Sequence, residues 1–365
     1  YDEAWLVLND YFYDKEFHGS NWDSIRLMYR PLVEYAEDFS TLSSIIYRMF
    51  GDLNASHLSF SRRSNDYLDY SNIGIDYKED GGYPRITRIY PGGPMDKSNI
   101  NAREGDYIVS IDGNDMKNTV PEKYLLDKNS KRVKIGLSGR PGGKAELYDI
   151  VPDGMWDRYA RLYETWVKRR RFLVDSLSNG RIGYIHIRSM GNRDFWKFQD
   201  KILFENAGKE GLILDIRNNG GGFSYDYYIT FFSRQSHLYK YGRYDDVKQS
   251  TPLLTWNKPV AMLINEGSFS NAEMFPSVFK QLGIGTIIGI PTAGGVIGTY
   301  NTELFDGTFY RIPALGVYDY EGVNLENNPT EPDIFVDNPP EDVKDNQDSQ
   351  LKRAVNDLLG QMDEE

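Results

Sequence analysis

Two serines lie in Asn265–Phe275, where the chain passes from a strand pattern to a helix pattern. The apolar run Pro259–Ile264 predicts a strand, and an amphipathic segment follows as far as Gly283. At a helix N-terminus, unpaired N–H groups and the positive end of the helix dipole favour an anion. An acyl-transfer enzyme needs this environment for its nucleophile and its oxyanion. Ser268 and Ser270 are therefore candidate nucleophiles, and helix capping is the simpler alternative for both.

A serine hydroxyl needs a base near neutral pH, and histidine is the side chain whose ordinary pKa suits that task. The chain has four histidines. His57 stands between two serines in a polar segment that follows a helical pattern, whereas His186 lies within a predicted strand. His18 and His237 lie in polar loops. His57 is therefore the candidate base.

The apolar run Gly211–Ile216 predicts a strand, and three consecutive glycines, Gly220, Gly221 and Gly222, follow it before a helical pattern. Such a run lets a substrate backbone approach closely and offers its own N–H groups. It lacks the lysine and the spacing of a phosphate-binding loop. We interpret the glycines as part of a site, with a plain flexible turn as the alternative.

The composition excludes several classes of function. A net charge of −12 disfavours nucleic acid, which binds basic surfaces. With no cysteine, the chain has no disulfide, thiolate metal site or cysteine nucleophile, and its four scattered histidines show no metal-ligand spacing. No apolar run reaches membrane-spanning length. A length of 365 residues with 40% apolar side chains predicts two or three folded domains.

Four regions differ in pattern, and together they predict an α+β multidomain protein. Residues 1–61 read as a helical unit, and residues 70–152 as short strands and turns. A linker helix is expected over residues 153–178, where the basic run Lys168–Arg171 is interpreted as a solvated face or an internal ion-pair surface. Residues 179–365 alternate strand and helix patterns, which predicts a sheet covered by helices.

The second region resembles a PDZ domain. The resemblance lies in Ile86–Met95 and above all in Ala102–Gly113, with its Glu-Gly-Asp-Tyr-Ile-Val-Ser-Ile-Asp-Gly sequence. PDZ domains capture extended peptides along a sheet edge. The segment Ser71–Ile75, where the peptide-binding loop would lie, lacks a Gly-Leu-Gly-Phe pattern. Peptide binding and a spacer role therefore both stay open.

Three blocks, Asp215–Gly222, Asn265–Glu273 and Gly289–Gly298, resemble the core of the carboxy-terminal processing (tail-specific) serine peptidases. That resemblance implies an α/β catalytic domain of the ClpP/crotonase-like type, with a PDZ domain ahead of it. In the branch with a Ser/Lys dyad, a lysine belongs where this chain has Gly295. The Gly-Gly-Val-Ile-Gly continuation instead resembles the tricorn branch, which uses a Ser-His-Ser-Glu tetrad.

The resemblance to the tricorn branch implies a role for each matching residue. Ser270 would be the nucleophile and His57 the base. Ser56 occupies the serine position before that histidine, and Glu326 lies in a matching Leu-Glu-Asn segment. Because an imidazole needs its far nitrogen held, Ser56 backed by Glu326 would orient His57.

The remaining site residues follow from the same resemblance. The oxyanion hole would use the N–H groups of Asn271 and of the triple glycine, with Gly222 as the first choice and Gly221 beside it. Asn271 stands where tricorn has aspartate, a change that leaves its N–H in place. Substrate-binding positions expected from this resemblance are Gly220, Gly294 and Gly295. In a divergent loop, Asp245 or alternatively Asp246 could set a preference for basic residues.

The expected protein is thus a serine endopeptidase or oligopeptidase that acts on peptides or unfolded proteins without metal or other cofactor. One alternative is a catalytically silent PDZ-containing peptide-binding protein. Another is a Ser/Lys-type tail-specific protease with a different lysine, such as Lys280. A homo-oligomer is an open expectation. Because the chain starts at Tyr1 without methionine, a trimmed start is expected, with the cell envelope, periplasm or export as the location and the cytoplasm as the alternative.

Overall fold

The computed structural model describes residues 1–62, 71–126, 128, 131–240, 249–252, 255–344 and 347–364. The chain forms two compact units, of which the first combines Tyr1–Arg63 with Arg170–Glu365 and the second is Ser64–Arg169. Among the described residues, no helix combines the length and the apolar character needed to cross a membrane.

A parallel sheet forms the centre of the first unit. Its strand order is β16-β13-β12-β9-β8, and every neighbouring pair is parallel. Strands β8, β9 and β12 are buried throughout, as expected for a sheet covered on both faces. The strands are β8 (Ile182–His186), β9 (Gly211–Asp215), β12 (Val260–Ile264), β13 (Thr286–Gly289) and β16 (Ile334–Phe335).

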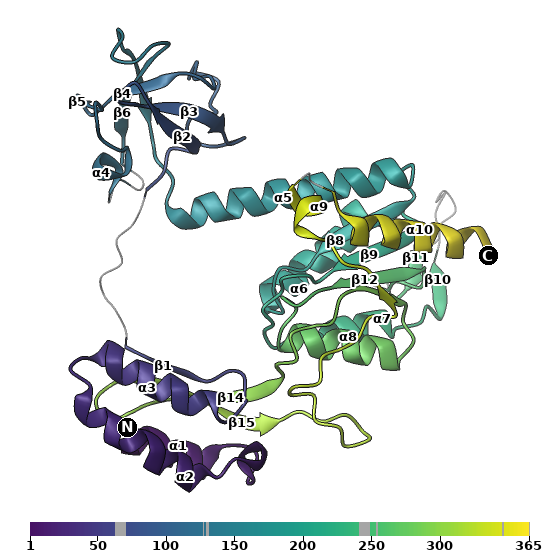
Figure 1. Cartoon of the computed structure of the whole chain (residues 1–365). Coiled ribbons are helices and arrows are strands. Elements are labelled where there is room, and N and C mark those ends of the chain that lie inside the picture. The colour runs from purple at the N-terminus through teal and green to yellow at the C-terminus, as the bar shows by residue number, and fades with distance from the viewer. Residues whose placement is uncertain are drawn as a thin grey trace. The chain divides into compact units, whose positions relative to one another are not determined.

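Helices cover both faces of this sheet (Figure 1). Helices α6, α7 and α8 contribute aromatic side chains to a core with alternate residues of β9 and β12. The C-terminal helix α10 contacts β9, β12 and β13 and buries its own apolar side chains. The bounds are α6 (Asn192–Asp200), which continues as the π-helical turn η3 (Lys201–Glu205), α7 (Tyr225–Phe232), α8 (Asn271–Gln281), α9 (Pro340–Lys344) and α10 (Ser349–Glu364).

The N-terminal helices pack on an antiparallel sheet of order β1-β15-β14. Strand β1 pairs with β15, so the start of the chain is joined to residues about 250 positions later. The helical unit expected over residues 1–61 therefore shares a core with the C-terminal part instead of standing apart. The elements are α1 (Asp2–Tyr11), η1 (Phe17–Gly19), α2 (Trp22–Tyr29), η2 (Arg30–Tyr35), α3 (Phe39–Gly51), β1 (Ser59–Ser61), β14 (Ile297–Glu303) and β15 (Phe309–Gly316).

Local signals in the sequence agree with these N-terminal elements. Helix α2 ends just before Pro31, and a 3-10 turn follows it. Asp38 caps α3, because its carboxylate accepts a hydrogen bond from the Thr41 N–H at 2.7 Å. The antiparallel pair of β10 (Leu238–Lys240) and β11 (Gln249–Thr251) completes the described strands of the first unit.

The second unit contains a strand path β2-β3-β4-β6-β7, with β5 paired to β4, around its own apolar core. Helix α5 (Met155–Leu177) spans the boundary of the two units. In the first unit, Arg170 and Arg171 of the basic run form ion pairs with Asp348 and Glu205. The second-unit elements are β2 (Ile75–Asp80), β3 (Tyr83–Ile89), β4 (Tyr107–Ile111), β5 (Asn114–Asp115), α4 (Glu122–Leu125), β6 (Val133–Ser138) and β7 (Glu146–Ile150).

Candidate active site

Ser270 lies at the N-terminus of α8, on a tight turn that follows β12. Its backbone has φ 59° and ψ −121°, a conformation that residues other than glycine rarely adopt. Such a conformation costs about 1–3 kcal/mol and persists only where the surrounding contacts hold it. The Ser270 N–H donates to the carbonyl of Gly295 at 3.1 Å. The turn is therefore tied to the loop that precedes β14.

The carboxylate of Glu273 fastens the turn to that loop. It is 1% exposed and accepts hydrogen bonds from the N–H groups of Ser270 and Gly295 at 3.2 and 2.8 Å. The Gly294 N–H and the Thr292 hydroxyl also donate to it. Burial raises the pKa of Glu273, although these hydrogen bonds favour the charged form. One buried side chain thus joins the serine to three neighbouring loop positions.

Asn219 joins the triple glycine to the same turn. Its side chain is fully buried, accepts from the Gly221 N–H at 2.9 Å and donates to the Ile187 carbonyl at 2.9 Å. Its backbone carbonyl accepts from the Phe269 N–H at 3.0 Å. A Cβ on Gly221 would lie 2.7 Å from the Ser270 Cβ, so only glycine fits at this place.

Two N–H groups near Ser270 donate to no protein acceptor within the described part of the chain, those of Gly222 and Asn271. Both could therefore receive a developing oxyanion. The Gly221 N–H, also expected as an oxyanion donor, is already engaged by Asn219. Gly220 is exposed, and a Cβ there would meet open space, so its backbone is accessible to a peptide.

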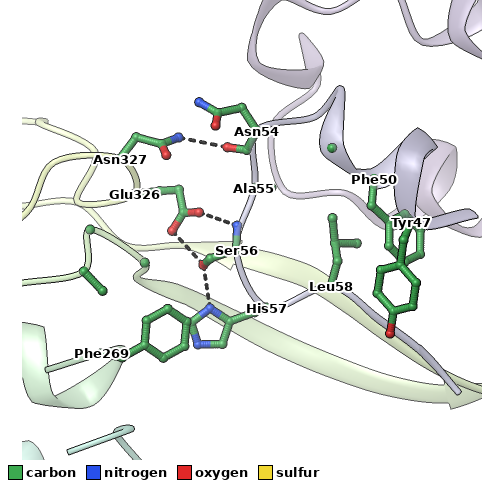
Figure 2. Close-up of a pocket in the computed structure, with 14 residues that line it drawn as sticks. Tyr47, Phe50, Asn54, Ala55, Ser56, His57, Leu58, Phe269, Glu326 and Asn327 are labelled. Carbon is green, nitrogen blue, oxygen red and sulfur yellow. Dashed lines mark hydrogen bonds between the residues drawn. The ribbon is translucent and has the colours of Figure 1, made fainter. Parts of the chain in front are cut away.

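Ser56, His57 and Glu326 form a continuous chain of hydrogen bonds, shown in Figure 2. Ser56 Oγ lies 2.6 Å from His57 Nδ1 and donates to Glu326 Oε2 at 3.0 Å. The Ser56 N–H donates to Glu326 Oε1 at 2.6 Å, and the Val296 N–H donates to Oε2 at 2.7 Å. Because a hydroxyl has one proton, Ser56 accepts from Nδ1–H while it donates to the carboxylate. The network thus leaves His57 Nε2 with a free lone pair.

The Phe269 ring stacks on the His57 imidazole, with the ring centroids 4.4 Å apart and the planes 17° apart. Phe269 immediately precedes Ser270, so this stack brings the histidine to the serine turn. A Cβ on Gly295 would lie 2.2 Å from the Phe269 ring and 3.0 Å from the Ser56 Cβ. The space for a side chain at position 295 is therefore filled by the aromatic ring that supports the histidine.

Burial, with a smaller contribution from the charge of Arg311, lowers the pKa of His57 to about 4. The imidazole is therefore neutral near pH 7, the form that a general base requires. His57 also has a positive φ of 65°, as does Asn327 at 63°, next to Glu326. Unusual backbone conformations thus occur on both sides of the hydrogen-bonded chain.

A buried ion-pair network supports the end of β9, ahead of the triple glycine. The Arg217 guanidinium donates to Asp215 Oδ1 from Nε and to Asp348 Oδ1 from Nη1, both at 2.9 Å. Burial alone would raise the pKa of Asp215, but Arg217 lowers it to about 2. The His186 imidazole lies 3.0 Å from the Arg217 carbonyl, consistent with a packed strand residue.

Several positions expected in the site have their backbone groups engaged elsewhere. Both N–H groups of Gly294 and Gly295 donate to Glu273, and their carbonyls accept from Asn327 and Ser270. The N–H and carbonyl groups of these two glycines are therefore already hydrogen-bonded within the protein, and the glycines shape the site. Asp245 and Asp246 lie outside the described residues.

Ser268 and Lys280, the residues of two alternative interpretations, each have hydrogen-bond partners in the structure. The Ser268 hydroxyl donates to the Ile216 carbonyl at 3.0 Å and is fully buried, as expected for a serine with a structural role. The Lys280 ammonium pairs with Asp333 at 2.9 Å and also donates to the Glu331 carbonyl. Among the described residues, no group of acidic and histidine side chains is arranged to hold a metal ion.

The sequence reasoning missed three residues that position the site: Asn219, Phe269 and Glu273. The spacing of Ser270 and Glu273 matches a capping box, so the glutamate carried a readable signal. Phe269 and Asn219 carried none, because an aromatic residue or an asparagine in a turn has many roles.

Comparisons with known proteins agree on one family. Residues 181–336 match the profile of peptidase family S41, residues 1–51 the tricorn protease C1 domain and residues 72–151 the tricorn protease PDZ domain. The tricorn protease of Thermoplasma volcanium is 31% identical over 100% of this chain and 36% of its own length. Tricorn protease homolog 1 of Streptomyces coelicolor is 28% identical, over 100% of this chain and 35% of that protein.

A solved structure shows the same likeness. The crystal structure of the tricorn protease aligns with a TM-score of 0.85 at 28% identity, covering 99% of this chain and 36% of that chain. The chloroplastic C-terminal processing peptidase of Tetradesmus obliquus is 24% identical over 92% of this chain and 76% of its own length. The chain spans about a third of the length of the tricorn relatives that it matches.

Proposed function

The chain belongs to the tricorn branch of the S41 serine peptidases, and on this premise we propose that it hydrolyses peptide bonds with Ser270 as nucleophile. The observation that carries the proposal is the hydrogen-bonded chain from Glu326 through Ser56 to His57 Nδ1. It holds the imidazole in the tautomer whose Nε2 can accept a proton. The stack on Phe269 brings that imidazole to the serine turn.

In the proposed first step, His57 Nε2 takes the proton of the Ser270 hydroxyl as Oγ attacks the carbonyl carbon of the scissile peptide bond. The carbonyl oxygen becomes an oxyanion, which the N–H groups of Gly222 and Asn271 stabilise. Each such donor contributes on the order of 3 kcal/mol to the transition state. The tetrahedral intermediate then collapses to an acyl-enzyme.

In the same collapse, His57 gives its proton to the leaving amine, which departs as the new N-terminus of the second fragment. A water molecule then attacks the ester, with His57 again as the base, and releases the first fragment with a free carboxylate. Glu326 stabilises the transient imidazolium through Ser56, because its carboxylate accepts from the serine hydroxyl that contacts Nδ1.

The proposed substrates are oligopeptides or unfolded protein segments, because the exposed backbone of Gly220 and the free N–H of Gly222 suit an extended chain. A preference for basic residues through Asp245, a homo-oligomeric assembly, and a location in the cell envelope or the cytoplasm stay predictions. The second unit would then be a PDZ-type module, whose peptide binding is a separate question.

The direct test is hydrolysis of a quenched fluorescent peptide library, together with labelling by a fluorophosphonate that reacts with activated serines. We expect Ser270→Ala to abolish labelling, and Ser270→Ala and His57→Ala each to lower kcat/KM by at least about 10⁴-fold. Ser56→Ala should lower kcat about 10²-fold while KM changes little, because only the orientation of the base is lost.

The matched control is Ser268→Ala, which removes a neighbouring serine that supports the turn but does not face the reaction. This variant should still be labelled. A wild-type protein that neither reacts with the probe nor cleaves any peptide would favour the alternative of a silent peptide-binding protein. Activity that survives His57→Ala would favour a lysine base.

A further inference from the structure

A cavity of about 410 Å³ lies beside the hydrogen-bonded chain of the site and is lined in part by His57 and Phe269. Figure 2 shows these two rings at one end, with Tyr47 and Phe50 of α3 at the other and Leu58 between them. The volume lies within the range of small-ligand sites and can hold the largest amino-acid side chain. The cavity is thus large enough to accept part of a substrate.

Aromatic and apolar side chains form one wall of this cavity, and each contacts neighbours in the N-terminal part of the chain. Phe50 is 4% exposed and packs in the N-terminal core. The Tyr47 ring packs edge-on against Phe50, and its hydroxyl accepts from the Phe60 N–H at 3.2 Å. Leu58 packs against the same core. A preformed apolar wall favours an apolar or aromatic side chain, because it removes apolar surface from water with little reorganisation.

Charge in the cavity argues against a charged occupant. Among the described residues that line it, Glu326 is the ionisable acid and none is a lysine or an arginine. Both Glu326 oxygens are engaged by Ser56, with Val296 as a third donor. A cationic side chain here would compete with the Ser56 hydroxyl for the carboxylate, and an anionic one would be repelled. A neutral side chain leaves the catalytic chain intact.

The position of the cavity next to His57 indicates which side of the scissile bond it serves. His57 delivers its proton to the amine of the leaving fragment, so the first residue of that fragment lies next to the imidazole. The cavity is lined by His57, whereas Gly220–Gly222, the glycines on the side of the oxyanion, do not line it. We propose that this cavity is the subsite for the side chain that follows the scissile bond, and that it selects large apolar or aromatic residues there.

This inference rests on the proposed peptidase function and deepens it. The test uses the full chain and a series of quenched peptides that differ only in the residue after the cleaved bond: Gly, Ala, Leu, Phe, Asp and Lys. Wild-type protein should cleave the Leu and Phe peptides with a kcat/KM about ten- to a hundredfold above the Gly peptide. The Asp and Lys peptides should fall at or below Gly.

Two variants locate this preference in the cavity. Ala293 lines the cavity and is exposed, so Ala293→Phe fills it from a surface position. We expect the ratio of kcat/KM for Phe over Gly to fall to about one in this variant. Leu58→Ala removes part of the apolar wall and should lower the same ratio several-fold. Phe305→Ala is the control, because Phe305 is a 91% exposed aromatic outside the cavity and should leave the ratio unchanged.

The outcomes separate the two proposals. Efficient cleavage with no preference at this position overturns the subsite but not the proposed peptidase function. A preference that Ala293→Phe and Leu58→Ala both leave unchanged has the same meaning. Absence of cleavage of every peptide, together with absence of fluorophosphonate labelling, overturns the proposed function itself.

Discussion

The proposed nucleophile and the proposed base stand on two different hydrophobic cores and are held in different ways. Ser270 lies over the core of the parallel sheet, and its turn is fixed by buried polar side chains on several sides. His57 lies over the core of the N-terminal helices, held by Ser56 on one edge and by Phe269 on one ring face. The nucleophile is thus fixed through its backbone, and the base through contacts with its side chain.

This difference predicts how each half responds to substitution. A backbone held by many hydrogen bonds resists the loss of any one of them, but the loss of a shared acceptor disturbs several at once. A side chain held by one hydrogen bond and one ring stack has no further contacts that compensate for the loss of either. Losing a single neighbour should therefore disturb the orientation of the base, and forcing a side chain into its place should disturb it most.

The largest effect is expected from Gly295→Lys, because any side chain here must displace the Phe269 ring from the imidazole. Peptide hydrolysis should fall by at least about 10⁴-fold, as expected when a catalytic base is lost. The melting temperature should show that the variant folds. Gly295→Lys with near wild-type activity would contradict this account, and activity that also survived His57→Ala would mean that the new lysine had become the base.

A double-mutant cycle sharpens the same point. Gly295→Ala alone should be strongly impaired, and Phe269→Ala alone should be moderately impaired. The double variant should lose less activity than the two single losses combined, since removing the ring relieves the closest contact of the new methyl group, although its contact with the Ser56 Cβ remains. Additive losses in the cycle would show that the ring and the glycine act independently.

On the nucleophile side, Glu273→Gln should lower kcat about 10²- to 10³-fold with a smaller change in KM. The amide places donors toward N–H groups that need acceptors, so the Ser270 turn loses its support. Thr292→Val is the control, because it removes one of the donors to Glu273, together with the acceptor of the Thr330 N–H, and should cost less than about tenfold. Equal losses in the two variants would mean that Glu273 acts only through Thr292.

The pH dependence tests the environment of the base. Because the imidazole must be neutral, and the pKa of His57 is lowered to about 4, kcat/KM should rise as pH increases through about 4 and then stay level toward neutrality. Arg311→Gln should shift the midpoint of this rise to slightly higher pH. The shift should be small, because burial is the larger cause of the lowered His57 pKa and remains in the variant. A wild-type midpoint near the ordinary histidine value of about 6.5 would show that the imidazole is not buried in the active enzyme.

The smallest effect is expected at Asn271. Its side-chain Oδ1 accepts from the Tyr225 N–H at 3.0 Å, an acceptor that aspartate retains, and the proposed oxyanion donor is the backbone N–H. Asn271→Asp should therefore keep kcat/KM within about threefold of wild type, measured on one peptide. Asn271→Leu, which leaves the Tyr225 N–H unpaired, should lower the melting temperature. A large loss in Asn271→Asp would mean that the side chain itself contacts the reacting atoms.

The sequence allowed strands β8, β9 and β12 of the parallel sheet to be predicted from their apolar runs, but not β13 or β16. The roles of Ser270, His57, Ser56 and Glu326 were expected from the resemblance of their motifs to a known family. The last three are joined in the structure as expected from the resemblance. The roles of the glycines were less predictable. A sequence cannot show which N–H groups are engaged, so Gly221, Gly294 and Gly295 appeared as free as Gly222.

The shared core of the N-terminal helices and strand β15 also escaped prediction, because strand pairing across about 250 positions leaves no local pattern. Phe269 was missed for a related reason. Its role depends on its ring stack with His57, which lies more than 200 positions earlier in the chain.

The pairing of β1 with β15 has a consequence for the order in which the protein folds. Residues 56 and 57 reach their partner at position 326 only after the intervening residues have been synthesised and the two distant parts have joined. Contacts of such long sequence separation form slowly. A chain in which these parts have not yet joined lacks the held imidazole, so the proposed peptidase activity should be among the last properties that the folding protein acquires.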